Sequence, residues 1–362
     1  MSNTPRFLFL TKRRTEHYGA TKSSGLYNSA AQVVQMLAAM GCTTWLVDVI
    51  DGNDIDREIV RTKATNVILE AFWVTPDKLR ELVGLHPKVQ FLVRNHSKTP
   101  FGSTEGIISG WMAEYALINN VTVAPNSLAV VDEMKLALDL PSLYLPNVYD
   151  KTSIERSLLH RVERWVRLHG CQSSPKPWIP GLLRVGVFGV PRVLKNVAVQ
   201  ALAAIAYARE NGLRLQFHIN SSRLNEGQGQ AIVKSIRSIF AAAEDVADLV
   251  EHDWLDRKEF LLLVARMDVV MQVSYTETFN IVLADACLVG TPVIGSADIE
   301  WLPRCLVADC NDFRSIAGRI NFVLGHRRDD VSEIAQEALD RWTVDAGCRW
   351  AQYAEQAGLS RA

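Results

Sequence analysis

The sequence SYTETFNIVLADACLVGTPVIGS, residues Ser274–Ser296, decides the fold. It joins the end of an apolar run over residues 267–274, a longer apolar stretch over 277–290, and a short run over 291–296 that begins with Thr-Pro. Short apolar runs bounded by polar residues are typical of buried strands, and the longer stretch between them is typical of a helix. A strand, a helix and a strand in this order predict a right-handed βαβ unit within a parallel sheet.

The same alternation extends in both directions along the chain. In the second half we expect strands over 182–190, 213–220 and 247–253, and helices over 196–209, 229–243 and 258–265. In the first half we expect strands over 7–10, 43–50, 66–74 and 89–97, and helices over 29–40 and 76–85. Alternation on this scale predicts two α/β domains, each with a doubly wound parallel sheet.

The two predicted domains follow one another along the chain. Residues 1–150 would form the first domain and residues 181–328 the second, with a connector over 151–180. Helices over residues 329–362 follow without a further strand and could return to the first domain. A length of 362 residues suits two domains better than one.

Composition narrows the class of protein. Hydrophobic residues make up 48% and charged residues 22%, which is typical of a globular chain. The formal net charge of −1 does not favour a molecule drawn as a whole to nucleic acid or acidic membranes. No apolar run is long enough for a signal peptide or a membrane helix. None of the six cysteines forms a C-x-x-C pair or a zinc-site spacing, so we expect free thiols, no metal and a cytoplasmic location.

Candidate ligand-binding residues follow the first strand of the second domain. In GVFGVPRVLKN, residues 186–196, the strand ends near Gly189, the loop carries Arg192, and Lys195 stands at the start of a helix. Parallel sheets bind ligands at the carboxyl ends of their strands, where helix N–H groups face phosphate. Two cations at such a helix start would suit a diphosphate, although for this loop taken alone a glycine turn with two solvated cations is the preferred interpretation.

Two acids mark the decisive stretch. Glu277 and Asp285 are separated by seven residues, a little over two helical turns, so they would project from the same side of the predicted helix. Carboxylates there could accept hydrogen bonds from sugar and ribose hydroxyls. The N–H groups of Thr278 and Phe279 would lie at the start of the helix. The alternative is a first-turn acid favoured by the helix dipole and an acid on the surface.

These pieces together resemble the group-1 glycosyltransferases, whose fold is named GT-B. That family has a glycine-ended strand, a loop lysine, an E-x7-E motif and a G-T-P-V-I strand. This chain has Lys195-Asn196, Glu277-x7-Asp285 and residues 290–294, in the same order. LPNVYD at 145–150 is similar to the family's interdomain strand end, and residues 253–274 are similar to the helix and strand before the motif.

The resemblance implies an architecture and an activity. It implies two Rossmann-like domains with a cleft between them, and transfer of a hexose from a nucleotide diphosphate sugar. It further implies retention of the anomeric configuration without a metal ion or a separate cofactor, cations stabilising the diphosphate instead. Lys195 and Arg192 would stabilise that diphosphate, Glu277 would contact the donor sugar and Asp285 the ribose. Thr278 and Phe279 would bind phosphate or sugar oxygens through N–H groups.

Two positions depart from the family pattern. The second acid is Asp285, one methylene shorter than glutamate, which would loosen or shift the ribose contact. The family's loop arginine directly follows the strand glycine, where this chain has Val190, so Arg192 would have to replace it. These departures keep a catalytically silent sugar-nucleotide-binding protein open as an alternative.

The first half matches the family less closely. The family's glycine-rich loop after the first strand would correspond to KSSGLYNSAAQ, with Gly25 as its glycine. His96 follows a predicted strand, beside Arg94, and in related enzymes a histidine at such a strand end touches the donor sugar. A structural histidine is the alternative there, and for His17 and His218 it is the preferred interpretation.

The acceptor is not identified by the sequence. Four cations follow the first strand, and a basic helix over 153–169 carries four arginines and Trp165. A glycan, a lipid-linked acceptor and, less favoured, a nucleic acid remain open. A sugar-nucleotide epimerase of the same fold is a further alternative, whereas an NAD-dependent enzyme is disfavoured because no G-x-G-x-x-G follows the first strand.

Overall fold

A computed structural model describes residues 4–13, 25–151, 179–222, 224 and 228–359. The chain divides into two compact units. Unit 1 comprises Met1–Ser153 and Trp342–Ala362, and unit 2 comprises Ile154–Arg341. The sequence-based division kept 329–362 separate, as helices that could return to the first domain, and here residues 342–362 belong to unit 1. The predicted connector lies almost wholly outside the described residues.

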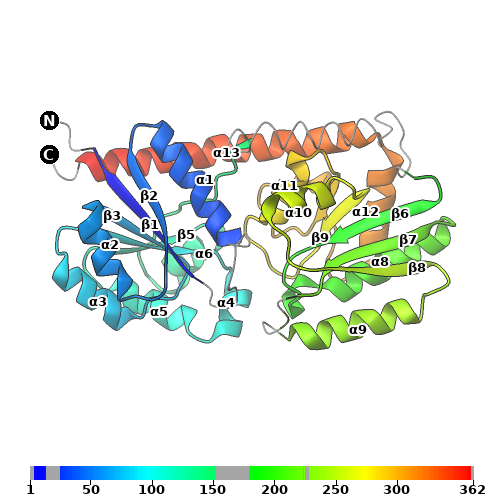
Figure 1. Cartoon of the computed structure of the whole chain (residues 1–362), viewed down its shortest axis with the longest axis horizontal. Coiled ribbons are helices and arrows are strands. Elements are labelled where there is room, and N and C mark those ends of the chain that lie inside the picture. Colours follow the sequence, from blue (N-terminus) through cyan, green and yellow to red (C-terminus); the bar gives the residue numbers. More distant parts are fainter. Residues whose placement is uncertain (1–3, 14–24, 152–178, 223, 225–227, 360–362) are drawn as a thin grey trace. The chain divides into compact units, whose positions relative to one another are not determined.

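Unit 1 is built on a five-stranded parallel sheet with strand order β2-β1-β3-β4-β5 (Figure 1). Its strands are β1 (Arg6–Lys12), β2 (Thr43–Val49), β3 (Asn66–Glu70), β4 (Gln90–Asn95) and β5 (Val121–Pro125). Its helices are α1 (Gly25–Ala39), α2 (Asp54–Thr62), α3 (Pro76–Leu85), α4 (Thr99–Glu105), α5 (Ile108–Ala116), α6 (Leu128–Asp132) and the π-helical turn η1 (Glu133–Ala137). The four strands expected from the sequence are present, and β5 is additional.

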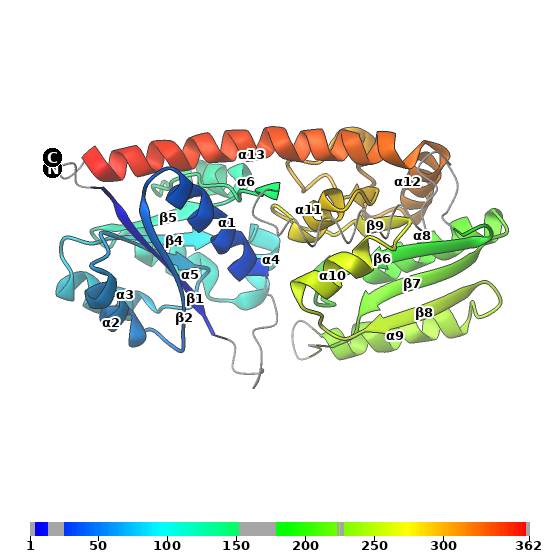
Figure 2. The same cartoon turned by 45° about the horizontal axis from the view of Figure 1, so that its top comes forward.

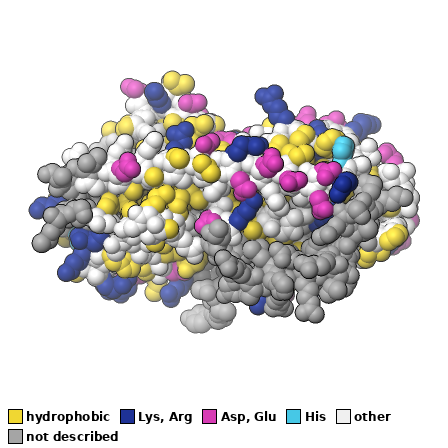
Figure 3. Space-filling model, turned by 90° about the horizontal axis from the view of Figure 1, so that it is seen from above, with side chains coloured by type: hydrophobic (Ala, Val, Ile, Leu, Met, Phe, Trp, Pro, Cys, Tyr) yellow, Lys and Arg dark blue, Asp and Glu magenta, His cyan; other side chains and the backbone are white. Residues whose placement is uncertain are grey.

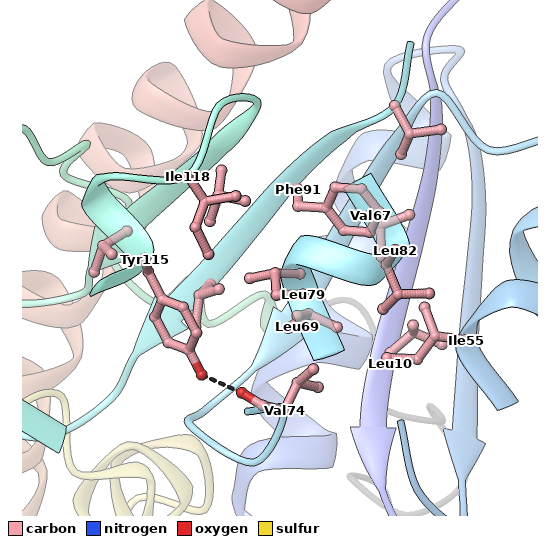
Figure 4. Packing of buried hydrophobic residues seen from close by; sticks show 14 of the residues in the cluster. Leu10, Ile55, Val67, Leu69, Val74, Leu79, Leu82, Phe91, Tyr115 and Ile118 are labelled. Atoms are coloured by element: carbon pink, nitrogen blue, oxygen red, sulfur yellow. Dashed lines mark hydrogen bonds between the residues drawn. The ribbon is translucent and has the colours of Figure 1, made fainter. Parts of the chain in front are cut away.

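Both faces of the first sheet are covered, which explains the unbroken apolar run of β1. Leu8 and Leu10 belong to one buried cluster, whereas Phe7 and Phe9 belong to another on the opposite face. Figure 4 shows part of the first cluster, where the Tyr115 hydroxyl donates to the backbone carbonyl of Val74. Such packing fixes the strand ends that carry the polar residues of this unit.

Unit 2 has a second five-stranded parallel sheet, with strand order β10-β9-β6-β7-β8. Its strands are β6 (Leu182–Val187), β7 (Arg214–Asn220), β8 (Ala247–His252), β9 (Val269–Gln272) and β10 (Val293–Gly295). Its helices are the 3₁₀ turns η3 (Val193–Lys195) and η4 (Arg304–Leu306), with α8 (Val197–Glu210), α9 (Gly229–Ala241), α10 (Arg257–Val264), α11 (Ile281–Leu288) and α12 (Phe313–Gly325). Every strand and helix expected in this half is found, which makes the two-sheet α/β architecture predicted from the sequence correct.

Helices cover both faces of the second sheet. Chain crossovers run outward from β6 to β8 through α8 and α9, then return and run outward again from β9 to β10 through α11. Because parallel crossovers are right-handed, helices on the two sides of this reversal lie on opposite faces (Figure 2). The sheet is therefore doubly wound.

The predicted final helices form one continuous helix, α13 (Arg328–Leu359). Its residues up to Arg341 belong to unit 2, and those from Trp342 onward belong to unit 1. In unit 1, Trp350 is fully buried, lies 6.0 Å from the Phe9 ring and donates its indole N–H to the Pro146 carbonyl at 2.9 Å. Across the described ranges, no helix is both long and apolar enough to cross a membrane.

Candidate functional site

The second sheet contains a point where its strand order reverses. β6 and β9 are neighbours, but the helix that follows β6 covers one face and the helix that follows β9 covers the other. Ligands of open α/β sheets bind beyond the carboxyl ends of such a pair, because the two diverging connections leave a crevice there. The loops after β6 and β9 therefore form the candidate site of unit 2.

The loop after β6 is shaped by residues with positive φ. Gly189 has φ +113°, a conformation that side chains rarely adopt, and its N–H donates to the Asn220 side chain at 2.9 Å. Asn196, at φ 55°, anchors the start of α8 by donating to the carbonyls of Val273 at 3.0 Å and Cys310 at 2.8 Å. The 3₁₀ turn between these residues presents Lys195.

Lys195 and Glu277 come together at this point. The Lys195 ammonium donates to the Glu277 carboxylate, and 26% and 11% of the two side chains are exposed. The Glu277 N–H donates to the Asp298 carboxylate at 3.1 Å, which fixes the backbone of the acid. A cation and an anion, both reachable from solvent, face each other between the two loops.

Gly189 and Lys195 also line a hollow at the end of β6, together with Val190 and apolar residues of α9. Arg192 precedes the 3₁₀ turn and is half-buried, and its carbonyl accepts from the Lys195 N–H at 2.9 Å. Gly189, Arg192 and Lys195 thus lie on one short loop, as the sequence indicated.

The start of the following helix differs from the prediction. We expected the helix to begin at Glu277, but α11 begins at Ile281. Asn280 has φ 56° and caps the helix by accepting from the Leu283 N–H at 3.0 Å. Glu277 and Thr278 therefore lie in the loop before the helix, and so does the buried Phe279. The assignment of their N–H groups to the helix start was wrong.

Asp285 lies on α11 and is buried rather than on the surface. Its carboxylate pairs with the Arg257 guanidinium at 2.8 Å, and 5% and 23% of the two side chains are exposed. Arg257 is the first residue of α10. Glu277 and Asp285 thus have different cationic partners on different elements. Arg257 could not be identified from the sequence, because the pair forms between two separate helices.

Gln272 is a further residue that sequence reasoning missed. It ends β9, is 1% exposed, and contacts Lys195 at 3.4 Å through its side-chain oxygen. A buried glutamine inside an otherwise apolar strand, VVMQ, was the available signal.

Unit 1 places His96 in a buried polar cluster at the ends of β3 and β4. His96 Nε2 lies 2.5 Å from a Glu70 oxygen, and Arg94, completely buried, contacts both Glu70 oxygens at 3.2 Å. Arg94 also donates to the Asn147 side chain at 2.9 Å and lies over the Trp350 ring. The sequence predicted polar residues here, but not Glu70 or Asn147.

The ionisation of this cluster is set by its charges and burial. Burial raises the pKa of Glu70, but the Arg94 guanidinium and His96 outweigh that effect and hold the pKa below its usual value. Burial, and then Arg94, lower the pKa of His96, against the opposing effect of Glu70. Glu70 is thus kept as a carboxylate and His96 as a neutral imidazole near neutral pH.

Several predictions concern the chain around the first sheet. Gly25 is the exposed first residue of α1. His17, most of the cationic loop and the basic helix over 153–169 lie outside the described residues. On the face that Figure 3 shows, acidic and basic side chains are interspersed.

Two further expectations from the sequence concern a metal site and His218. Within the described ranges, no group of three His, Cys, Asp or Glu side chains could hold a metal ion. His218 stacks on His252 with ring centroids 5.2 Å apart, and its Nδ1 lies 2.9 Å from Nε2 of His252. Burial, with His252 and Arg184 nearby, lowers the pKa of His218 to about 3.

No protein-family model and no curated protein sequence matches the chain. Solved structures do match it. The glycosyltransferase from Rickettsia africae ESF-5 aligns with a TM-score of 0.67 at 11% identity, over 99% of this chain and 100% of that one. Sucrose-phosphate synthase from Thermosynechococcus elongatus gives 0.72 at 13% identity, over 98% and 100%. HepE from Anabaena, solved with UDP-glucose, gives 0.62 at 14% identity, over 98% of each chain. The shared feature is the GT-B fold.

Proposed function

We propose that this chain is a glycosyltransferase that moves a hexose from a nucleotide diphosphate sugar to an acceptor, with retention and without a metal ion. The observation that carries the proposal is the Lys195–Glu277 pair between the loops after β6 and β9. An ammonium group at the carboxyl ends of parallel strands would stabilise the negative charge that develops on a departing diphosphate. The carboxylate beside it would accept hydrogen bonds from sugar hydroxyls.

The other residues of unit 2 would extend the site from the sugar to the nucleoside. Gly189 has a φ that residues with side chains rarely adopt, and because it carries no side chain a phosphate could approach its backbone. Arg192 would add a second cation, and Thr278 and Phe279 would supply N–H groups from the loop before α11. The Asp285–Arg257 pair would face the ribose.

In unit 1 we assign the donor-facing role to His96 and Gly25. Glu70 holds His96 in place, and burial and Arg94 lower the pKa of its imidazole, which suits a hydrogen bond to a neutral sugar hydroxyl. Gly25, the first residue of α1, would approach the donor through its backbone. The acceptor, whether a glycan, a lipid-linked molecule or a nucleic acid, is to be found by screening.

The matches to solved proteins support a nucleotide-sugar donor. HepE was solved with UDP-glucose, and the trehalose-phosphate synthase from Burkholderia xenovorans, which aligns with a TM-score of 0.63 at 10% identity, is described as UDP-forming. Both descriptions refer to UDP, which supports our proposal of a nucleotide-sugar donor at the site in unit 2.

Thermal unfolding with UDP, GDP, ADP, dTDP and CMP, each alone and as its sugar conjugate, tests the donor. A ligand at one hundred times its Kd stabilises the native state by about 2.7 kcal/mol, enough for a clear shift. We expect one nucleotide to raise the melting temperature and Lys195→Ala to remove most of that shift. No shift with any nucleotide would refute the donor site.

Turnover separates the enzyme from its alternatives. With the binding sugar nucleotide and a panel of acceptors, release of the free nucleoside diphosphate indicates transfer, and proton NMR of the new anomeric centre reports retention. Binding without release favours the catalytically silent protein. Conversion of the sugar nucleotide into its epimer, with the nucleotide still attached, favours the epimerase.

A further inference from the structure

Gln272 brings one buried amide to the centre of the candidate site. It is the last residue of β9 and is 1% exposed. A buried amide destabilises the fold unless its polar atoms are hydrogen-bonded. The residue therefore needs partners on the segments around it.

The partners of Gln272 come from the two loops of the crevice. Its Nε2 donates to the Phe188 carbonyl, in the loop after β6, at 2.8 Å. Its Oε1 accepts from the Asn280 side chain, which caps α11, at 3.2 Å and from the Lys195 ammonium at 3.4 Å. One side chain thus links the two loops of the crevice and contacts the lysine of the first.

The chemistry of these partners fixes the orientation of the amide. A carbonyl only accepts and an ammonium only donates, so the amide N–H₂ must face Phe188 and the amide oxygen must face Lys195. Asn280 is fixed in the same way, because its Oδ1 accepts from the Leu283 N–H and its Nδ2 is left to donate to Gln272. The chain of hydrogen bonds has one direction, from α11 to the loop after β6.

Resting on the proposed function, we infer that Gln272 is a positioning residue that holds the Lys195 ammonium at the diphosphate when Glu277 turns to the donor sugar. Lys195 has Glu277 and Gln272 as acceptors. A sugar bound to Glu277 would compete for the carboxylate. The amide oxygen of Gln272 would remain, and because it is neutral it would orient the ammonium without cancelling the charge that the phosphates need.

The experiment compares affinities for a nucleoside diphosphate and the corresponding monophosphate by calorimetry, using the base that the thermal screen selects. The Kd of the monophosphate divided by the Kd of the diphosphate measures the preference for the diphosphate, and so what the second phosphate contributes. We expect Gln272→Met, which keeps chain length, to lower this ratio about five- to tenfold, and Lys195→Met to lower it at least as much. In the double variant the loss should equal that of Lys195→Met alone, since Gln272 acts through the lysine.

Thr291→Val is the matched control for loss of stability. Thr291 is fully buried and its hydroxyl donates to the Val264 carbonyl at 3.0 Å, but it precedes β10 and so lies at the amino ends of the strands. We expect this variant to unfold at a lower temperature with an unchanged diphosphate-to-monophosphate ratio. A purely structural role of Gln272 would give the same result as the control.

The outcomes separate the two proposals. A wild-type preference for the diphosphate that survives in Gln272→Met overturns the inference alone, as does additive loss in the double variant. A wild-type protein that binds no nucleoside diphosphate refutes the proposed function and the inference with it. If Gln272→Met does not fold, Gln272→Glu replaces it. Its carboxylate would draw the ammonium away from the phosphates, so an unchanged ratio in that variant also overturns the inference.

Discussion

Lys195 and Glu277 are separated by 82 positions in the sequence, yet the ammonium of one donates to the carboxylate of the other. The separation disappears because β6 and β9, whose loops carry the two residues, are neighbours in the sheet although two strands lie between them along the chain. The pair therefore depends on the strand order of unit 2, and it gives the most direct test of the site.

Replacing the two members of the pair should have different effects on binding. We expect Lys195→Ala to weaken binding of the nucleoside diphosphate tenfold or more, because a charged partner of the phosphates is lost. Glu277→Gln frees the ammonium, so the diphosphate should bind equally well or more tightly, while the extra affinity of the sugar conjugate falls. Calorimetry with both ligands measures this, and turnover should be abolished in both variants with thermal unfolding nearly unchanged. Equal losses for both ligands in both variants would contradict separate roles.

The buried Asp285–Arg257 pair should matter for ribose. If Asp285 contacts the ribose, Asp285→Asn should weaken a nucleoside diphosphate about five- to tenfold but leave its 2′,3′-dideoxy analogue unaffected, because the missing interaction is with the hydroxyls. Competition binding with the two ligands measures the difference. Equal weakening of both ligands would instead show that the pair acts only by holding α10 and α11 together.

His218 should make unit 2 sensitive to acid. Its pKa of about 3 in the folded protein lies below the ordinary value near 6.5, so between these values the unfolded chain binds a proton that the native protein does not. Stability should therefore fall as pH decreases through this window, by up to about 2 kcal/mol between pH 7 and pH 5. Urea unfolding at both pH values should show a smaller loss in His218→Leu than in the wild type. The same loss in both proteins would show that other groups, such as His252, cause it.

Removing one partner of the Glu70–Arg94 pair should strongly lower the free energy of unfolding. Both side chains are completely buried, so Arg94→Met leaves a buried carboxylate and should cost about 3–5 kcal/mol of unfolding free energy, whereas joint replacement by Glu70→Leu and Arg94→Met should cost less. Arg209→Met, which breaks the exposed pair with Asp245, is the control and should cost much less. Chemical denaturation compares all four proteins. A similar small loss in every variant would mean that water reaches Glu70.

Much of the architecture could be predicted because strands buried on both faces leave apolar runs in the sequence. The run at Phe7–Leu10 and the runs of unit 2 are of this kind. The place of Lys195 beyond the end of a strand could be predicted because its loop follows directly from one of those runs. The β5 strand, Val121–Pro125, was not identified, since it is short and holds a threonine and a proline.

The parts that could not be predicted depend on contacts between distant segments. The sequence around Asp285 does not indicate Arg257 as its partner, and the sequence around His96 does not indicate Glu70. Both pairs form only when separate elements pack together. The start of α11 was misplaced for a local reason. Asn280 adopts a left-handed conformation and caps the helix there, which the apolar pattern does not reveal.

The division of α13 between the two units has a consequence for synthesis on the ribosome. The Phe9 ring of the first strand packs against Trp350, which is translated only after the whole of unit 2. Until then one face of the first sheet lacks part of its cover, although its five strands have already emerged. All strands of unit 2 have been translated before that point. Unit 2 can therefore finish folding before unit 1, although its residues follow most of unit 1 in the sequence. A nascent chain stalled before Trp342 would present an apolar surface suited to chaperones.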